Sequence, residues 1–244
     1  MELKICHLYP DVLNLYGDQG NIICLKHRLE ARGIGAEIIG LPIGANADFT
    51  QFDMFFIGGG QDFEQEVLLD DLAGGKSADI RAAVEDEKVF LTICGGYQMM
   101  GSYYRTHDGV QCDFIGAMDL YTLGQEQRII GNMMFRCSDE NGGSTVVGFE
   151  NHSGRTYLGE KCRPLGTILK GSGNNGEDGT EGARYKNAFG SYSHGPILPK
   201  NPEFADFLLY TALVRRYGQA HLDEIDDSFE NAAHEYMLER LTGK

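Results

Sequence analysis

The most informative segment of the chain is Val89-Phe90-Leu91-Thr92-Ile93-Cys94-Gly95-Gly96-Tyr97-Gln98. An apolar run long enough for a buried strand ends at a cysteine, and two glycines follow before a helix can begin. This pattern is typical of a nucleophile elbow, a tight turn that exposes a reactive side chain at the carboxyl edge of a parallel sheet. The N-terminus of the following helix would favour the Cys94 thiolate, and the Gly95 N–H would face a developing oxyanion. The alternative is a cysteine buried only for packing.

Strand and helix patterns alternate on the N-terminal side of this segment. The expected strands are Leu3–Tyr9, Gly35–Leu41, Met54–Gly58 and Lys88–Ile93, and the expected helices are Asn21–Arg32 and Ala78–Glu87. Strands separated by helices predict a parallel sheet that is covered by helices.

After Ile115 the alternating strand and helix patterns give way to short β-like runs. These runs are Gly131–Cys137, Thr145–Glu150, Arg155–Leu158 and Ala183–Ser193. The glycine-rich segment 170–182 predicts a flexible loop, and two helices are expected within residues 202–241. No linker separates two folding units, so we expect one domain over residues 1–244, with a core of about 3–210.

Composition excludes several classes of protein. The chain has 244 residues and a net charge of −15, and this charge argues against a nucleic-acid partner. It has no apolar run of about 18 residues, so we expect no membrane span, and its start lacks the features of a signal peptide. The six cysteines include no Cys-x-x-Cys pair, which argues against a zinc ribbon or a disulfide scaffold. We expect a cytoplasmic protein.

Two phosphate-binding motifs are matched only in part. Gly75-Lys76-Ser77 resembles the end of a P-loop but lacks its earlier glycine and its strand, so a solvated turn is the better interpretation. The segment 171–176 fits G-x-G-x-x-G, but Glu177 and Asp178 follow it and would repel a pyrophosphate. We therefore predict no ATP or NAD site, no other cofactor and no metal.

Five segments together carry a resemblance to a known family. Cys94-Gly95-Gly96-Tyr97-Gln98 fits the C-x-G-x-Q elbow of class I glutamine amidotransferases, and the remaining segments are Tyr9–Asn21, Gly148–His152, Gly173–Asp178 and Gly190–Pro196. The chain resembles the branch related to cobyric acid synthase, and within it the glutaminase subunits of lipid II isoglutaminyl synthase. The likeness implies a flavodoxin-like three-layer α/β fold with a β-rich second half.

A cysteine nucleophile needs a proton shuttle, for which histidine is the usual residue near neutral pH. By resemblance this residue is His194, whereas His152 takes a supporting position. Many class I enzymes carry a glutamate two residues after the histidine, where this chain has Pro196. We therefore expect the orienting acid to be remote in this chain or to come from a partner subunit. In either case the isolated chain is expected to be a poor or unregulated glutaminase.

Glutamine must also be held while it reacts. The turn Gly58-Gly59-Gly60-Gln61-Asp62 allows the backbone to approach the substrate closely, and by resemblance Gly60 is the second oxyanion donor. Arg128 matches a substrate-binding arginine of the family, and a guanidinium suits the α-carboxylate of glutamine. The context of Gln98 also favours glutamine.

The expected activity is hydrolysis of L-glutamine through a Cys94 thioester. By resemblance the ammonia goes to a separate, ATP-dependent, Mur-ligase-like (MurT) subunit, which amidates the D-glutamate of lipid II. Three alternatives remain open at this point. They are an amidotransferase of the same branch with another acceptor, such as a cobyrinate-type carboxylate, a cysteine hydrolase of the DJ-1/PfpI type, and a binding subunit without activity.

Overall fold

The computed structural model describes residues 1–60 and 62–243 and contains two β-sheets. The first sheet has the strand order β11 (Ala183–Tyr185), β12 (Ala188–Ser191), β4 (Val89–Ile93), β3 (Met54–Ile57), β1 (Glu2–Leu8) and β2 (Gly35–Leu41). All of its neighbouring strands are parallel except β11, which runs antiparallel to β12. The predicted parallel sheet is therefore confirmed.

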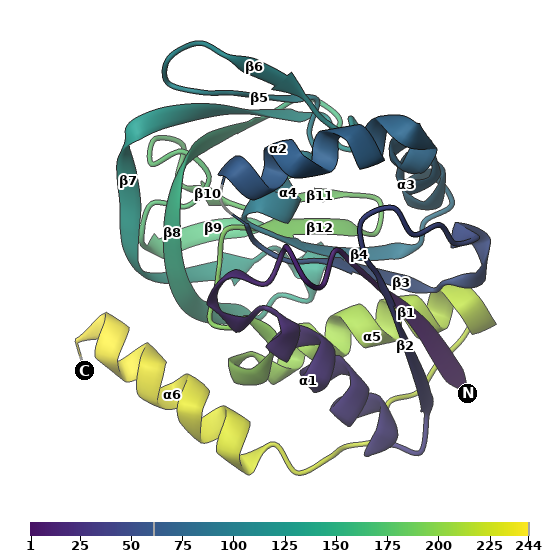
Figure 1. The fold of residues 1–244 in the computed structure, drawn as a ribbon. Helices are drawn as coiled ribbons and strands as arrows, with labels where there is room; N and C mark the ends of the chain where they lie inside the picture. Colours follow the sequence, from purple (N-terminus) through teal and green to yellow (C-terminus); the bar gives the residue numbers. More distant parts are fainter. Residues whose placement is uncertain (61, 244) are drawn as a thin grey trace.

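Helices cover both faces of this sheet, as Figure 1 shows. One face carries α1 (Gln19–Glu30) and α5 (Pro202–Tyr217), and the other carries α2 (Asp62–Asp71), α3 (Ser77–Glu85) and α4 (Gly95–Met99). The expected apolar stripe of α1, which includes Leu25 and Leu29, is fully buried. Short turns of 3-10 helix are η1 (Leu15–Gly17), η2 (Phe49–Gln51), η4 (Asp139–Asn141) and η5 (Leu198–Lys200). This arrangement is the expected three-layer α/β fold.

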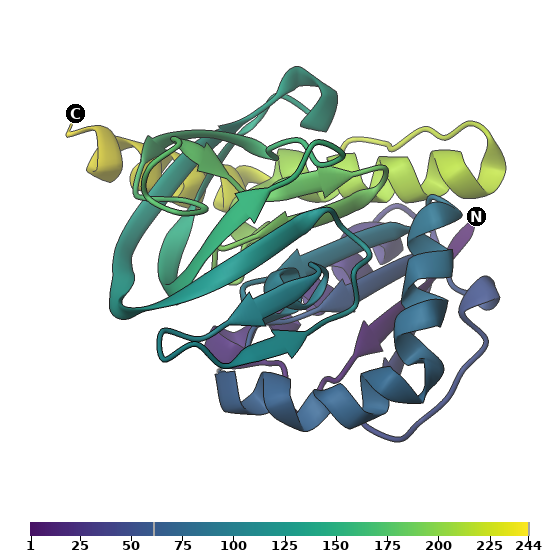
Figure 2. The same cartoon turned by 90° about the horizontal axis from the view of Figure 1, so that it is seen from above.

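The second sheet confirms the β-rich second half. Its order is β10 (Thr180–Glu181), β9 (Gly166–Lys170), β7 (Leu120–Cys137), β5 (Tyr103–Arg105) and β6 (Gln111–Asp113), and β8 (Thr145–Leu158) also pairs with β7. Strands β7 and β8 form a long antiparallel ribbon beside the first sheet (Figures 1 and 2). The ribbon is longer than the sequence predicts because polar, exposed residues interrupt the apolar pattern before Gly131.

Two expectations about loops are wrong. Lys76 does not lie in a solvated turn but in a π-helical segment, η3 (Leu72–Lys76), where it is buried and pairs with Asp71 at 2.5 Å. The glycine-rich segment 170–182 is held in place by hydrogen bonds instead of being a loose loop. The N–H groups of Ser172 and Gly173 donate to the buried Glu150 carboxylate at 2.8 and 2.9 Å.

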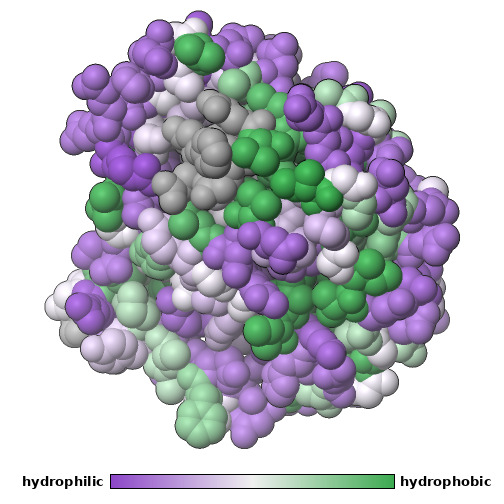
Figure 3. Space-filling model, in the orientation of Figure 1, coloured by the Kyte–Doolittle hydropathy of each residue, from purple (hydrophilic) through white to green (hydrophobic). Residues whose placement is uncertain are grey.

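The helix α6 (Ser228–Thr242) closes the chain and packs on the ribbon through Leu241, which meets Met134 and Val147. The segment before it is held by the buried Arg28, which pairs with Asp206 and Asp227 at 2.8 and 2.5 Å. The face seen in Figure 3 is mainly hydrophilic, with patches of hydrophobic residues between the polar ones. Within the described residues, no helix has both the length and the apolar character needed to cross a membrane.

Candidate active site

Cys94 lies at the carboxyl end of β4 in the tight turn that the sequence predicts. Its φ of 49° is rare for a residue with a side chain, and this strain is typical of a nucleophile elbow. The turn needs Gly96, because a Cβ there would lie 2.7 Å from the carbonyl oxygens of both Ile57 and Gly58. The helix after it, α4, has only five residues, so its dipole contributes less than the sequence suggests.

His194 follows the neighbouring strand, β12, so the two residues meet at one edge of the sheet. The Cys94 N–H donates to Ser191 O at 2.8 Å, which ties the two strand ends together. His194 also exchanges backbone hydrogen bonds with Phe149 of β8, at 2.8 and 3.2 Å. Its ring is fully buried between the rings of Phe149 and Tyr16, at centroid distances of 5.5 and 4.9 Å.

A carboxylate also faces His194, and it comes from the N-terminal part of the chain. Asp18 Oδ1 lies 3.5 Å from His194 Nδ1, and Asp18 Oδ2 accepts the Gly59 N–H at 2.7 Å. A Cβ on Gly59 would lie 2.9 Å from His194 Cε1, 3.0 Å from Asp18 Oδ2 and 3.3 Å from Cys94 Cβ. Any side chain at position 59 would therefore crowd His194, Asp18 and Cys94 at once.

The neighbours of His194 shift the pKa of its imidazole. Burial disfavours the imidazolium, but the adjacent Cys94 sulfur and the hydrogen bond to Asp18 outweigh burial and raise the pKa of His194 to about 10. The imidazole is therefore protonated at neutral pH and can donate a proton to a leaving group. No described residue forms a hydrogen bond with the buried Nε2 atom of His194.

A small cavity brings together four of the sequence-predicted residues, and His194 and Gly95 are not in its lining. It is lined by Leu15, Gly60, Cys94, Gln98, Arg128, Asn151, His152 and Ser153. Its volume of about 20 Å³ accommodates little more than one water molecule. The cavity must widen before an amino acid can enter. Gln61, which belongs to the predicted glycine turn, lies outside the described residues.

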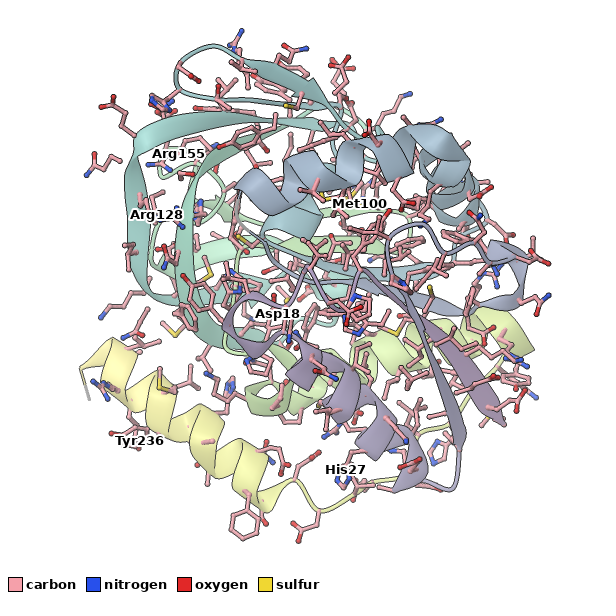
Figure 4. All side chains as sticks on the ribbon, viewed as in Figure 1. Asp18, His27, Met100, Arg128, Arg155 and Tyr236 are labelled. Carbon is pink, nitrogen blue, oxygen red and sulfur yellow. The ribbon has the colours of Figure 1, made fainter. Side chains whose placement is uncertain are left out.

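Arg128 reaches this cavity from the exposed side of the ribbon. The pairing of β7 with β8 shifts register between Gly124 and Ile129, and such a bulge redirects side chains beside a site. The Arg128 guanidinium donates to Asn151 Oδ1 at 3.0 Å and to Asn151 O at 3.1 Å. Asn151 Nδ2 in turn donates to Tyr16 Oη at 2.5 Å. Figure 4 shows Arg128 on the ribbon and Asp18 near the start of α1.

Gln98 and His152 form a buried polar part of the cavity wall. Gln98 Nε2 donates to Tyr192 Oη at 3.0 Å, and His152 stacks on the Tyr192 ring at 3.7 Å. His152 Nδ1 also lies 2.8 Å from Gly154 O, and its Nε2 lies 3.9 Å from Glu150 Oε2. Burial lowers the pKa of His152, so its ring is neutral. His194, not His152, is the histidine that lies beside both Cys94 and Asp18.

Sequence reasoning missed Asp18 and Tyr16 as site residues. Asp18 precedes a helix and reads as a cap, but Asn14 Oδ1 accepts the Gln19 N–H at 2.8 Å instead, and the Asp18 side chain makes no capping bond. The sequence gives no local signal for this role, because Asp is a common residue at a helix start.

Comparison with known proteins identifies the family. The CobB/CobQ-like glutamine amidotransferase domain matches residues 4–202. This chain belongs to that family. It is 43% identical over 219 residues to "Lipid II isoglutaminyl synthase (glutamine-hydrolyzing) subunit GatD" of Streptococcus pneumoniae, which covers 89% of this chain and 83% of that protein. The same subunit of Staphylococcus aureus is 43% identical over 239 residues, or 98% and 96% of the two chains.

More distant relatives extend the comparison of sequence and fold. A probable cobyric acid synthase of Methanothermobacter thermautotrophicus is 33% identical over 68% of this chain but only 34% of its own length. A glutamine amidotransferase structure from Thermotoga maritima matches 99% of both chains with a TM-score of 0.57 at 14% identity. PurLQS from the same organism matches 87% of this chain and 98% of its own, with a TM-score of 0.54 at 14% identity. These two structures share the fold.

Proposed function

We propose that this chain is the glutaminase subunit of a lipid II isoglutaminyl synthase. It hydrolyses L-glutamine to glutamate and ammonia, and the ammonia amidates the D-glutamate of lipid II on a partner subunit. The observation that carries the proposal is the meeting of Cys94 and His194 at adjacent strand ends, in a chain that is 43% identical to GatD subunits over nearly its whole length.

In the first half of the reaction, the Cys94 thiolate attacks the side-chain amide carbon of glutamine. The negative charge that develops on the amide oxygen is held by the backbone N–H groups of Gly60 and Gly95. The carbon–nitrogen bond then breaks, and the proton on His194 Nε2 passes to the leaving nitrogen, which departs as ammonia. A glutamyl thioester remains on Cys94.

In the second half, the now neutral His194 accepts a proton from a water molecule that attacks the thioester carbon. The bond to sulfur breaks, glutamate leaves, and the thiolate and imidazolium are restored. Arg128 holds the α-carboxylate of glutamine throughout, since a guanidinium donates two parallel hydrogen bonds to a carboxylate. To do so it exchanges its contacts with Asn151 for contacts with the substrate.

The acceptor reaction requires ATP chemistry for which this sequence carries no motif. We therefore propose a separate synthetase subunit of the Mur-ligase-like (MurT) type, which receives the ammonia in a heterodimer. Both GatD relatives carry the word subunit in their names, which supports this division. A cobyrinate-type acceptor is less well supported, because this chain spans only about a third of the length of a cobyric acid synthase. Membership of the amidotransferase family disfavours a DJ-1/PfpI-type hydrolase.

The test is ammonia release from L-glutamine by the purified chain, with and without the candidate synthetase, beside the Cys94→Ser and His194→Ala variants. We expect release by the wild type, loss in both variants, and transfer of the amide nitrogen to lipid II only when the synthetase and ATP are present. If the wild type releases no more ammonia than Cys94→Ser under either condition, the chain is not a glutaminase.

A further inference from the structure

Asp18 carries a buried charge that the reaction described above does not use. Its side chain is fully buried, and a buried carboxylate is costly unless charged or polar partners surround it. Its partners in the described residues are the Gly59 N–H, at 2.7 Å from Oδ2, and His194 Nδ1, at 3.5 Å from Oδ1. The carboxylate therefore lies between the glycine turn after β3 and the histidine after β12.

The loop between β1 and α1 fixes this position. The Leu15 N–H donates to Gly59 O at 3.0 Å, so both the carbonyl and the N–H of Gly59 are hydrogen-bonded to this loop. The first turn of α1 is also locked to the histidine segment. A Cβ on Gly20 would lie 2.4 Å from Pro196 Cγ, so the backbone of α1 and the proline are in direct contact. Pro196 occupies the place of the usual glutamate, and the contact holds the start of α1, with Asp18 just before it, beside the His194 segment.

We propose that Asp18 is the positioning residue of this active site, which holds the His194 ring with Nδ1 toward itself and Nε2 toward Cys94. The inference rests on the glutaminase function proposed above. Cε1, the ring atom between the two nitrogens of His194, points at Gly59. A Cβ at Gly59 would lie within contact distance of Cε1, of Asp18 and of Cys94. This is the arrangement in which an acid fixes the tautomer and orientation of a histidine without taking the proton itself.

Such a role places the orienting acid in this chain and not on a partner subunit. When His194 carries the proton that ammonia will receive, the Asp18 charge stabilises the imidazolium. When His194 is neutral, the hydrogen bond keeps the proton on Nδ1, so that Nε2 is free to accept one from water. Cys94 and Asp18 are the titratable groups that act on His194, and Tyr16 and Phe149 cover its ring.

The test compares Asp18→Asn, Asp18→Glu and Asp18→Ala with Asp11→Asn, an exposed aspartate in the same loop that serves as the matched control. Asparagine keeps an oxygen for the Gly59 N–H but removes the charge, whereas glutamate keeps the charge. The full-length chain is assayed alone and with the synthetase. The readouts are kcat and KM for ammonia release, thermal unfolding, and the pH dependence of Cys94 alkylation by iodoacetamide, followed by peptide mapping.

We expect kcat of Asp18→Asn to fall roughly 100-fold or more while KM changes by less than about threefold, because orientation of the base acts on the chemical step. The alkylation profile of Cys94 should shift to higher pH, since the imidazolium that stabilises the thiolate is weakened. Asp18→Glu should recover part of kcat and of the profile, and Asp11→Asn should match the wild type.

Two results would overturn the proposal. One is an active Asp18→Asn variant with unchanged kcat and alkylation profile, and the other is an equal loss in the asparagine and glutamate variants with the profile unmoved, which indicates a purely structural role. If Asp18→Asn does not fold, the pH dependence of Cys94 alkylation in Asp18→Glu still tests the proposal. Because this variant keeps the negative charge, its alkylation profile should stay close to that of the wild type. A wild type without glutaminase activity refutes the proposed function instead, and the alkylation profiles still report on the contact with His194.

Discussion

The candidate active site combines two regions that differ in burial and in bonding. The edge of the parallel sheet supplies Cys94, His194 and Asp18, all of them buried and tied to neighbouring backbone. The β7–β8 ribbon supplies Arg128 from an exposed bulge, where its contacts are with the side chain and carbonyl of Asn151.

This difference corresponds to two tasks. The chemical step requires catalytic groups that are held in one fixed geometry. The ends of buried parallel strands hold side chains in this way. Substrate admission requires groups that can exchange partners, and an exposed arginine bonded to an asparagine can do so. Because the cavity between the regions holds little more than one water molecule, we expect the ribbon side to move when glutamine enters.

The largest expected effect comes from removing the nucleophile at the sheet edge. Cys94→Ser should lower ammonia release by about 1000-fold or more, because a hydroxyl is a far weaker nucleophile than a thiolate. Cys24→Ser is the matched control, since burial raises the pKa of that thiol to about 12 and keeps it unreactive. Equal activity in Cys94→Ser and wild type would show that Cys94 at the sheet edge is not the nucleophile.

A smaller but still large effect is expected at Gly59, where the three sheet-edge residues meet. The Cβ of Gly59→Ala would press on His194 and Asp18, and a displaced base should lower kcat by about 100-fold. Gly131→Ala in β7 is the control, because a Cβ there has open space. Steady-state kinetics measure the change in kcat, and thermal unfolding shows whether the variant is still folded. If Gly59→Ala retains full kcat, the close packing of this edge is not needed for the chemistry.

On the ribbon, Arg128→Ala should act on binding more than on chemistry. The loss of a charge-assisted contact to the α-carboxylate should raise KM for glutamine by about 10- to 100-fold. The change in kcat should be much smaller. Arg136→Ala, an exposed arginine on the same strand, serves as the control. A fall in kcat with KM unchanged would mean that the two regions do not divide the tasks in this way.

The smallest expected effect concerns Glu181, which joins the two sheets behind the site. Its Oε1 accepts hydrogen bonds from Ser191 Oγ and the Tyr192 N–H, at 2.7 and 2.8 Å. Burial raises its pKa from 4.5 to about 7, so the folded state holds this proton more tightly than the unfolded state. The resulting stabilisation is complete below pH 4.5 and is lost as the pH rises through about 7.

Urea unfolding of wild type and Glu181→Gln across this pH range measures that contribution. We expect the free energy of unfolding of the wild type to decrease relative to the variant as the pH rises, by on the order of 1–3 kcal/mol. If the free energy of unfolding depends on pH in the same way for the two proteins, Glu181 titrates alike in the folded and unfolded states.

The sequence predicted the sheet edge better than the ribbon. The segment around Cys94 is a local pattern of buried strand and glycine turn, so its structure follows from neighbouring residues. The Asp18 contact joins residues 176 positions apart, and its carboxylate looks like a helix cap until the capping bond is seen on Asn14. The sequence does not predict a strand at the bulge around Arg128, because its residues are polar and exposed. A strand is predicted from the alternation of apolar and polar residues, and this segment lacks it.

The most direct test of the account is to find the covalent intermediate. The full-length chain is mixed with L-glutamine labelled in its carbon skeleton, quenched in acid within the first turnover and mapped by peptide mass spectrometry. We expect one glutamyl group on the peptide that contains Cys94, and none in the Cys94→Ser variant. Ammonia release by the wild type with the label absent from Cys94, or present on another residue, would contradict it.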